Sequence, residues 1–256
     1  MICTLENAVR KLPQFKIKRD IDRENRFMEK VRSYIEEHAR GFDSTIIDKE
    51  EYDKIIHWIA QYKLFLNYQR REEEGIEYEE FCEISKKKRK VWRKPTAEEN
   101  PPCSPPKKGL LLVGKTGRGK TTVARIVGGF FNMPFASLDE IDVAWSRNPT
   151  KCEAEYAPYF LKASPIVIDD VGAETGQKRY GNESIVTSLL HRWYDDWRFN
   201  GKQIIMTSNL STWDGAPDNQ ATFLGKYGER IHSRILEMFE VVKINGSVDL
   251  RKEVTL

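Results

Sequence analysis

The chain has 256 residues, a length that fits one large domain or two smaller ones, and its 39% hydrophobic content allows a core of ordinary size. Charged residues make up 32% of the chain but the net charge is only +3, so the total charge requires no nucleic-acid partner and any such contact would depend on a local patch. The four cysteines lack C-x-x-C or Cys/His ligand spacing, which argues against a zinc site, and no apolar run approaches membrane-spanning length, so we expect reduced thiols and a cytoplasmic location.

Residues 1–94 are expected to form a small α-helical domain. A first apolar stripe at helical spacing ends before Gly41, and a second follows Asp48, which can cap a helix with Glu51 in a capping box. The two stripes consist of Phe27, Val31, Tyr34, Ile35 and His38, and of Ile55, Ile59, Tyr62 and Leu66. Two amphipathic helices without recognisable chemistry suit a contact with a partner protein, or serve only to stabilise the rest of the chain.

A third, more charged segment runs from Tyr78 to Trp92 and contains KKKRK at 86–90. As a helix it would spread these five cations around most of its circumference, which favours a solvated face over a nucleic-acid patch. Five of the eleven prolines then fall within 94–109. Such a stretch can be neither helix nor central strand, so 95–108 is interpreted as an extended linker.

Short apolar runs alternate with helical stretches after the linker. This alternation predicts an α/β domain over 109–256, with a five-stranded parallel sheet and flanking helices. The expected strands are GLLLVG (109–114), MPFASL (133–138), PIVIDDV (165–171), QIIMTSN (203–209) and FEVVKI (239–244).

The string GKTGRGKT at 114–121 follows the first of these strands and opens a helical segment, which is the context of a P-loop. Backbone N–H groups freed by the glycines can surround phosphate, Lys120 can neutralise the β- and γ-phosphates, and Thr121 can offer its hydroxyl to Mg²⁺. The predicted ATP-binding residues are Gly114, Lys115, Thr116, Gly117, Arg118, Gly119, Lys120, Thr121 and Thr122.

An apolar strand ending in two acids comes about fifty residues later, in IVIDDVGAE at 166–174. Asp169 is expected beside Mg²⁺, and Asp170 can polarise the water that attacks the γ-phosphate. The alternative is a solvated pair of acids in a turn. Asn209 ends another apolar strand and could bond the γ-phosphate or the attacking water.

Two arginines four residues apart, Arg230 and Arg234 in GERIHSRI, share one face of a predicted helix. An arginine aimed inward usually meets an anion. Ion pairs to Glu229 or Glu237, or solvation, are the alternatives.

Together, GKTGRGKT, IDDVGAE, TSN and GERIHSRI resemble the AAA+ ATPases, and among them the DnaC-type bacterial helicase loaders and the related IstB-type transposition helpers. The resemblance covers about 107–251 and does not extend to residues 1–95. It implies a P-loop AAA+ fold without a C-terminal lid, since only about a dozen residues follow the last strand. Arg234 would then reach the ATP of a neighbouring subunit in a head-to-tail assembly, with Arg230 as a helper.

The resemblance also places basic residues toward single-stranded DNA in the loop after the Asp-Asp strand. Here that loop contains GQKRY at 176–180, where Lys178 and Arg179 could hold phosphates and Tyr180 could stack on a base. A solvated surface loop is the competing interpretation.

The sequence therefore favours a slow, switch-like, Mg²⁺-dependent ATPase that loads a replicative helicase onto single-stranded DNA. Residues 1–94 would grip the helicase. A transposition helper that recruits a transposase to DNA is the first alternative. A small-molecule P-loop kinase is the second, and it is disfavoured because it has no use for an arginine pair aimed at a neighbour.

Overall fold

The computed structural model describes residues 26, 28–30, 32, 33, 37, 47–82, 87–100, 102–160, 165–174, 185–212 and 221–245, with backbone alone at 78, 80–82, 87 and 89. They divide into two compact units. The hairpin unit includes Lys63–Ser104, and the sheet unit includes Met28–Tyr62 and Pro105–Leu256. The apolar stripe predicted at Phe27 to His38 lies outside the described residues.

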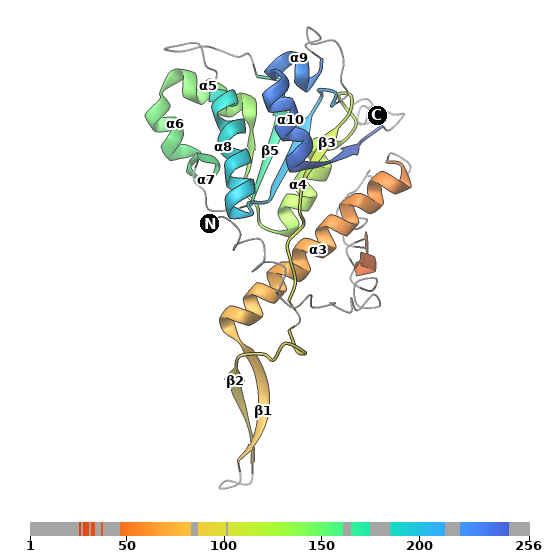
Figure 1. Cartoon of the computed structure of the whole chain (residues 1–256), viewed down its shortest axis with the longest axis vertical. Coiled ribbons are helices and arrows are strands. Elements are labelled where there is room, and N and C mark those ends of the chain that lie inside the picture. Colours follow the sequence, from red (N-terminus) through yellow and green to blue (C-terminus); the bar gives the residue numbers. More distant parts are fainter. Residues whose placement is uncertain are drawn as a thin grey trace, which may run out of the picture. The chain divides into compact units, whose positions relative to one another are not determined.

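Five parallel strands form the sheet of the larger unit, in the order β4-β5-β6-β3-β7 (Figure 1). This confirms the predicted α/β fold, and each strand lies where an apolar run was noted. The bounds are β3 Gly109–Val113, β4 Phe135–Ser137, β5 Ile166–Val171, β6 Ile204–Ser208 and β7 Phe239–Lys243. Their residues are largely buried because helices cover both faces of the sheet.

Different helices cover the two faces of the sheet (Figure 1). On one face α4 (Lys120–Phe130) packs against the central strands, and a Cβ added to Gly128 would come within 2.6 Å of Val167. The other face holds the larger apolar core, which contains Leu111, Ile168 and Met206. It is covered by α5 (Leu138–Arg147), α6 (Pro149–Glu155), α7 (Ala157–Phe160), α8 (Ile185–Asn200), α9 (Phe223–Tyr227) and α10 (Glu229–Met238).

The first half of α3 (Lys49–Glu74) belongs to the sheet unit, not to a separate N-terminal domain. Ile55, Ile56 and Ile59 are fully buried, and Trp58 meets Phe131 edge-on at 6.1 Å. The division of the chain therefore falls inside α3, which differs from the expected boundaries at 94 and 108.

The end of the proline-rich stretch is fixed to the sheet unit through four successive carbonyl groups. Side chains of α3 and of the α8–β6 region donate one hydrogen bond to each of them. The bonds run from Gln61 to Pro105 (3.4 Å), from Gln203 to Pro106 (3.1 Å), from Trp197 to Lys107 (3.1 Å) and from Trp58 to Lys108 (2.7 Å). Residues 105–108 thus behave as part of the folded unit and not as a free linker.

The helix expected over 78–92 is wrong: residues 76–82 and 87–93 are two antiparallel strands of a hairpin, β1 (Ile76–Cys82) and β2 (Lys87–Arg93). Gly75 ends α3 at a φ of +83°, and a Cβ there would come within 2.7 Å of Arg93 O. Pairing the acidic strand with the basic one brings Lys88 to 3.1 Å from Glu79, and Lys90 to 3.2 Å from a carboxylate of Glu77. These cross-strand ion pairs stabilise the hairpin, because they place basic residues of β2 beside acidic residues of β1.

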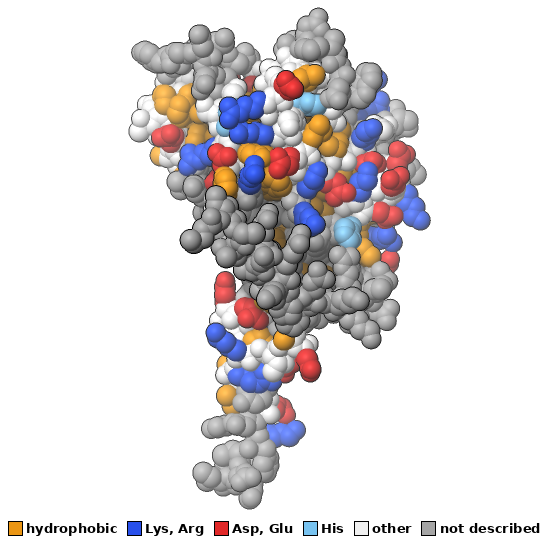
Figure 2. All heavy atoms as spheres, in the orientation of Figure 1, with side chains coloured by type: hydrophobic (Ala, Val, Ile, Leu, Met, Phe, Trp, Pro, Cys, Tyr) orange, Lys and Arg blue, Asp and Glu red, His pale blue; other side chains and the backbone are white. Residues whose placement is uncertain are grey.

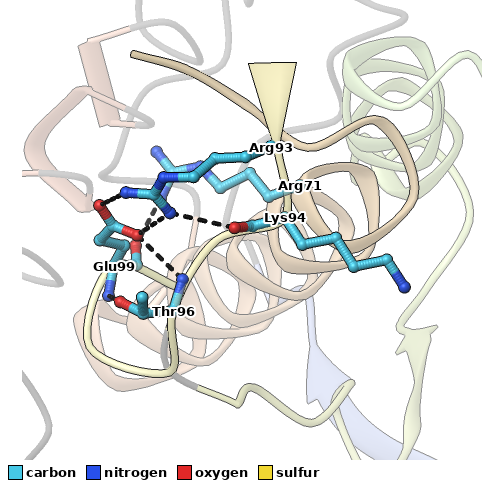
Figure 3. A network of polar contacts seen from close by, with 5 residues as sticks. All are labelled: Arg71, Arg93, Lys94, Thr96 and Glu99. Carbon is cyan, nitrogen blue, oxygen red and sulfur yellow. Dashed lines mark hydrogen bonds and ion pairs between the residues drawn. The ribbon is translucent and has the colours of Figure 1, made fainter. Parts of the chain in front are cut away.

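An arginine–carboxylate pair fixes the end of β2 within the hairpin unit (Figure 3). Arg93 donates to both oxygens of Glu99, at 2.7 and 2.6 Å, and Glu99 also accepts from the backbone N–H of Thr96 at 2.9 Å. The hydrogen bonds from Arg93, followed by the one from Thr96, lower the pKa of Glu99 to about 2.

Charges of both signs are interspersed over the described part of the face drawn in Figure 2. This distribution agrees with the small net charge of the chain.

Candidate active site

The loop between β3 and α4 holds Lys120 at the start of the helix. Gly119 stands before it in the left-handed conformation, with a φ of 85°, which a larger residue would adopt only at a cost. The side chain of Lys120 is buried, and its Nζ donates to Lys115 O at 2.9 Å and to Asn209 Oδ1 at 2.7 Å. The lysine therefore joins the loop to the residue that follows β6.

Asp169 accepts hydrogen bonds from two hydroxyl groups on two different elements. Thr121 Oγ1, in the first turn of α4, donates to Asp169 Oδ1 at 3.0 Å, and Thr207 Oγ1 donates to the same oxygen at 2.5 Å. Asp169 and Thr207 are both buried. Their bonds fix the carboxylate at the end of β5 beside the start of α4.

Asp170 occupies an irregular position in β5. The register between β5 and β6 shifts between Ile168 and Val171, and Asp170 has a φ of +54°, which is uncommon for a residue other than glycine. Its backbone N–H donates to Thr207 Oγ1 at 2.9 Å. A bulge of this kind re-aims a side chain and is over-represented next to active sites.

The sheet order explains why these residues meet. β5, β6 and β3 are direct neighbours, so their carboxyl ends lie at one edge of the sheet. Ligands of open parallel sheets bind at this edge. The structure thus brings together Lys120, Thr121, Asp169 and Asn209, which lie up to 89 residues apart in the chain, and it joins the backbone of Asp170 to the same group through Thr207.

The oxygen pair of Thr121 and Asp169 fits the needs of a magnesium ion. Mg²⁺ prefers hard oxygen ligands and usually takes only one or two from the protein, with water and phosphate oxygens supplying the rest. No group of three or more His, Cys, Asp or Glu suited to a metal occurs among the described residues. The chain therefore offers the partial ligand set of a nucleotide–metal site.

Arg118 adds a further cation to the P-loop, beside Lys115 and Lys120. Its Nη1 is buried and has no hydrogen-bond partner in the described part of the chain. A loop that carries three cations, Lys115, Arg118 and Lys120, and no acidic residue suits an anionic ligand.

Arg230 and Arg234 lie on α10, which packs against α8, on the face opposite α4. Arg234 stacks on the ring of Tyr194, with its guanidinium carbon 4.4 Å from the ring centroid, and its Nη1 contacts His191 Nδ1. Arg230 is exposed. Within the described ranges neither arginine forms an ion pair with Glu229 or Glu237; Glu237 accepts from the Tyr194 hydroxyl at 2.7 Å instead.

Glu174, a buried residue three positions after β5, was not among the predicted site residues. Its side chain is only 2% exposed, and it accepts from the Gly172 N–H at 2.8 Å and from the Tyr227 hydroxyl at 2.5 Å. Burial, followed by the negative charge of Glu174, raises the pKa of Tyr227. The signal was the string IDDVGAE, of which Glu174 is the last residue. The predicted DNA-contacting residues Lys178, Arg179 and Tyr180 follow it and lie outside the described residues.

Residues 110–234 match the profile of the family described as "ATPase family associated with various cellular activities (AAA)". The match runs from β3 through the P-loop, both acids and Asn209 to Arg234. Residues 110–234 are an AAA ATPase domain. The AAA domain occupies just under half of the chain, and the match confirms the predicted AAA+ resemblance.

Solved structures similar to this chain include a DnaC helicase loader, DnaI and DnaA. A DnaC helicase loader is 22% identical, with 54% of this chain and 78% of that chain covered and a TM-score of 0.39. DnaI is 18% identical, with 54% and 73% covered and a TM-score of 0.42. AMPPCP-bound DnaA from Aquifex aeolicus is 19% identical, with 56% and 42% covered and a TM-score of 0.41. No curated protein matches the chain. Within the described ranges, no helix is both long and apolar enough to cross a membrane.

Proposed function

We propose that this protein is a Mg²⁺-dependent ATPase that loads a replicative helicase onto single-stranded DNA in the cytoplasm. The observation that carries the ATPase part is the convergence of Lys120, Thr121, Asp169 and Asn209 at one edge of the sheet, through hydrogen bonds of 2.7 and 3.0 Å. A P-loop lysine, a hydroxyl and a carboxylate held this closely are the parts from which phosphoryl-transfer sites are built.

Each residue has a distinct part in the proposed hydrolysis. The P-loop amides and Lys120 hold the phosphates, and Thr121 and Asp169 orient Mg²⁺, which neutralises charge on the phosphate oxygens. Asp170, which stands one residue beyond Asp169 at the end of β5, takes the proton of the attacking water. Asn209 orients that water or the γ-phosphate. Such a site supports a slow ATPase that works as a switch.

Arg234 and Arg230 are proposed to complete the site of a neighbouring subunit. They lie on the helix α10, which packs on the face of the sheet opposite α4, the helix that follows the P-loop. The P-loop of the same chain also already has Lys120 and Mg²⁺ as its cations. Contacts that bring one surface of a subunit to a different surface of the next generate rings or filaments. An arginine supplied in trans is worth about 10³–10⁵ in rate in well-studied phosphoryl transfers, and a switch ATPase should gain less.

The loader role rests on the strings IDDVGAE and GERIHSRI and on the proposed arginines in trans. A transposition helper remains the alternative, since it would share all of these features. A small-molecule kinase is disfavoured because it does not need Arg234 to reach a second subunit.

Single-stranded DNA is proposed to contact Lys178, Arg179 and Tyr180. Residues 1–94 are proposed to hold the helicase. Lys178 and Arg179 would bind DNA phosphates, and Tyr180 would stack on a base.

The test is a binding experiment with the full chain. It should capture the purified replicative helicase of the same organism, and adding ATP and single-stranded DNA should release the helicase onto the DNA. Lys120→Ala should capture helicase but fail to release it with ATP. Capture of a transposase in place of the helicase would favour the helper role, and binding of neither would overturn both.

A further inference from the structure

Glu174 links the strand that carries the two acids to α9. Its Oε1 accepts from the Tyr227 hydroxyl at 2.5 Å and lies 3.2 Å from Lys226 Nζ, while Oε2 accepts from the Gly172 N–H at 2.8 Å. Gly172 is only two residues beyond Asp170. One carboxylate therefore holds both the end of β5 and the last two residues of α9.

Lys226 completes the link from the other side. Its Nζ donates to Gly172 O, and also to Glu174 O at 3.2 Å. Both backbone groups of Gly172 are thus occupied, the N–H by Glu174 and the carbonyl by Lys226. A Cβ on Gly172 would also come within 2.6 Å of Leu210, the residue after Asn209, so β5 is held at this point between α9 and the end of β6.

The link continues from α9 into the arginine-bearing helix. Gly228 is the single residue between α9 and α10, and its N–H donates to Leu224 O at 2.8 Å. The first turn of α10 bonds back to the same glycine, from His232 N to Gly228 O at 3.1 Å. The two helices also pack against each other. A displacement of Tyr227 must therefore move the start of α10.

A buried carboxylate is a costly way to stabilise a core. Removing the Glu174 carboxylate from water carries a desolvation penalty that an apolar residue of similar size would avoid, although its partner Lys226 stays partly exposed. Polar clusters of this kind instead fix one geometry, because each hydrogen bond has a direction. Here the fixed geometry joins Asp170 to the helix of Arg230 and Arg234.

We infer that Glu174 is a positioning residue that transmits a shift at the catalytic acids to α10, and so sets where Arg230 and Arg234 are presented. The inference rests on the proposed ATPase function and adds to it the route by which nucleotide would control the arginine helix. Glu174 itself touches neither nucleotide nor metal in this scheme.

Hydrogen exchange with and without Mg²⁺ and a non-hydrolysable ATP analogue tests the route. In the wild type we expect nucleotide to change exchange in two places, the P-loop with α4 (109–130) and the arginine segment (223–238). Glu174→Gln keeps the size of the side chain but loses its charge. It should keep the change in 109–130 and lose at least half of the change in 223–238. Tyr227→Phe should weaken the response in the same direction, and Glu153→Gln, an exposed carboxylate on α6, should behave as wild type.

Two results would overturn the inference while leaving the ATPase proposal intact. One is a full nucleotide response of 223–238 in a folded, nucleotide-binding Glu174→Gln protein. The other is a wild type that responds in 109–130 alone. If Glu174→Gln fails to fold, Tyr227→Phe decides between the same results. Failure of the wild type to bind nucleotide at all would overturn the proposed function and this inference together.

Discussion

Lys120 Nζ lies 2.7 Å from Asn209 Oδ1, a hydrogen bond that joins the first residue of α4 to the residue following β6. The bond fixes the orientation of the Asn209 amide, because its oxygen faces the lysine and its NH₂ group must then point elsewhere. An oriented amide donor beside a P-loop lysine can address the γ-phosphate or the attacking water.

Replacing Asn209 with Ala should separate binding from turnover. We expect ATP affinity to change little, since Lys120 keeps its contact with the loop, while ATP turnover falls by about 100-fold, as for loss of one preorganised donor. Equilibrium nucleotide titration and steady-state hydrolysis measure the two effects. The control is Asn148→Ala, which removes the N-cap of α6 and should cost about 1 kcal/mol of stability without affecting turnover. Equal turnover in Asn209→Ala and wild type would contradict this role.

Asp170→Asn should abolish hydrolysis and spare ATP binding. The amide cannot accept a proton from water, and loss of a general base costs roughly 10²–10⁴ in rate. Asp195→Asn, which changes an exposed residue of α8, is the matched control and should hydrolyse ATP normally. If Asp170→Asn loses binding as well as turnover, Asp170 shares the metal with Asp169 and is not a separate base.

Trp58→Phe should destabilise the sheet unit, because Trp58 on α3 holds the backbone of Lys108. The phenyl ring keeps much of the packing but loses the 2.7 Å bond to Lys108 O, so we expect a loss of about 0.5–1.5 kcal/mol in the free energy of unfolding. Trp92→Phe is the control, because Trp92 is 63% exposed and its replacement should change stability by less than about 0.5 kcal/mol. Urea denaturation of the full chains measures both, and equal midpoints would remove the proposed anchoring of residues 105–108.

Glu99 should titrate well below an ordinary glutamate. Its pKa of about 2 lies below the usual value because the charged form is bonded by Arg93 and Thr96, so the interaction stabilises the fold at neutral pH and is lost as the pH falls from about 4.5 toward 2. Carbon-detected NMR of the carboxyl group gives the midpoint directly. Arg93→Gln should move that midpoint upward, and a wild-type midpoint near 4.5 would show that the pair does not form in solution.

Reasoning from the sequence located the parts of the fold that short-range patterns encode. Runs such as GLLLV and IIMTS are strands because they are buried on both faces, and GKTGRG (114–119) is a loop because its glycines free the backbone. The hairpin was not predicted because basic residues of β2 are neutralised by acidic residues of β1. This pairing cannot be recognised when the basic segment is considered alone.

The same limit applies to the candidate site. Lys120, Asp169, Asp170 and Asn209 could be predicted because each lies within or after the carboxyl end of a strand, and these ends meet at one edge of the sheet. The bonds of Glu174 to Tyr227 and Lys226 span more than 50 residues, and no local pattern relates the two segments. Similarly, the seat of Arg234 on Tyr194 depends on how α10 packs against α8.

Mixing two inactive variants tests the central claim most directly, namely that one subunit binds ATP at Lys120 while Arg234 of another completes the site. Lys120→Ala and Arg234→Ala each remove one half of the shared site. Under conditions that allow assembly, each alone should show little ATP hydrolysis. The mixture can pair an intact P-loop with an intact arginine and should recover part of the wild-type rate. An assembled Arg234→Ala protein that hydrolyses ATP at the full wild-type rate would contradict the account.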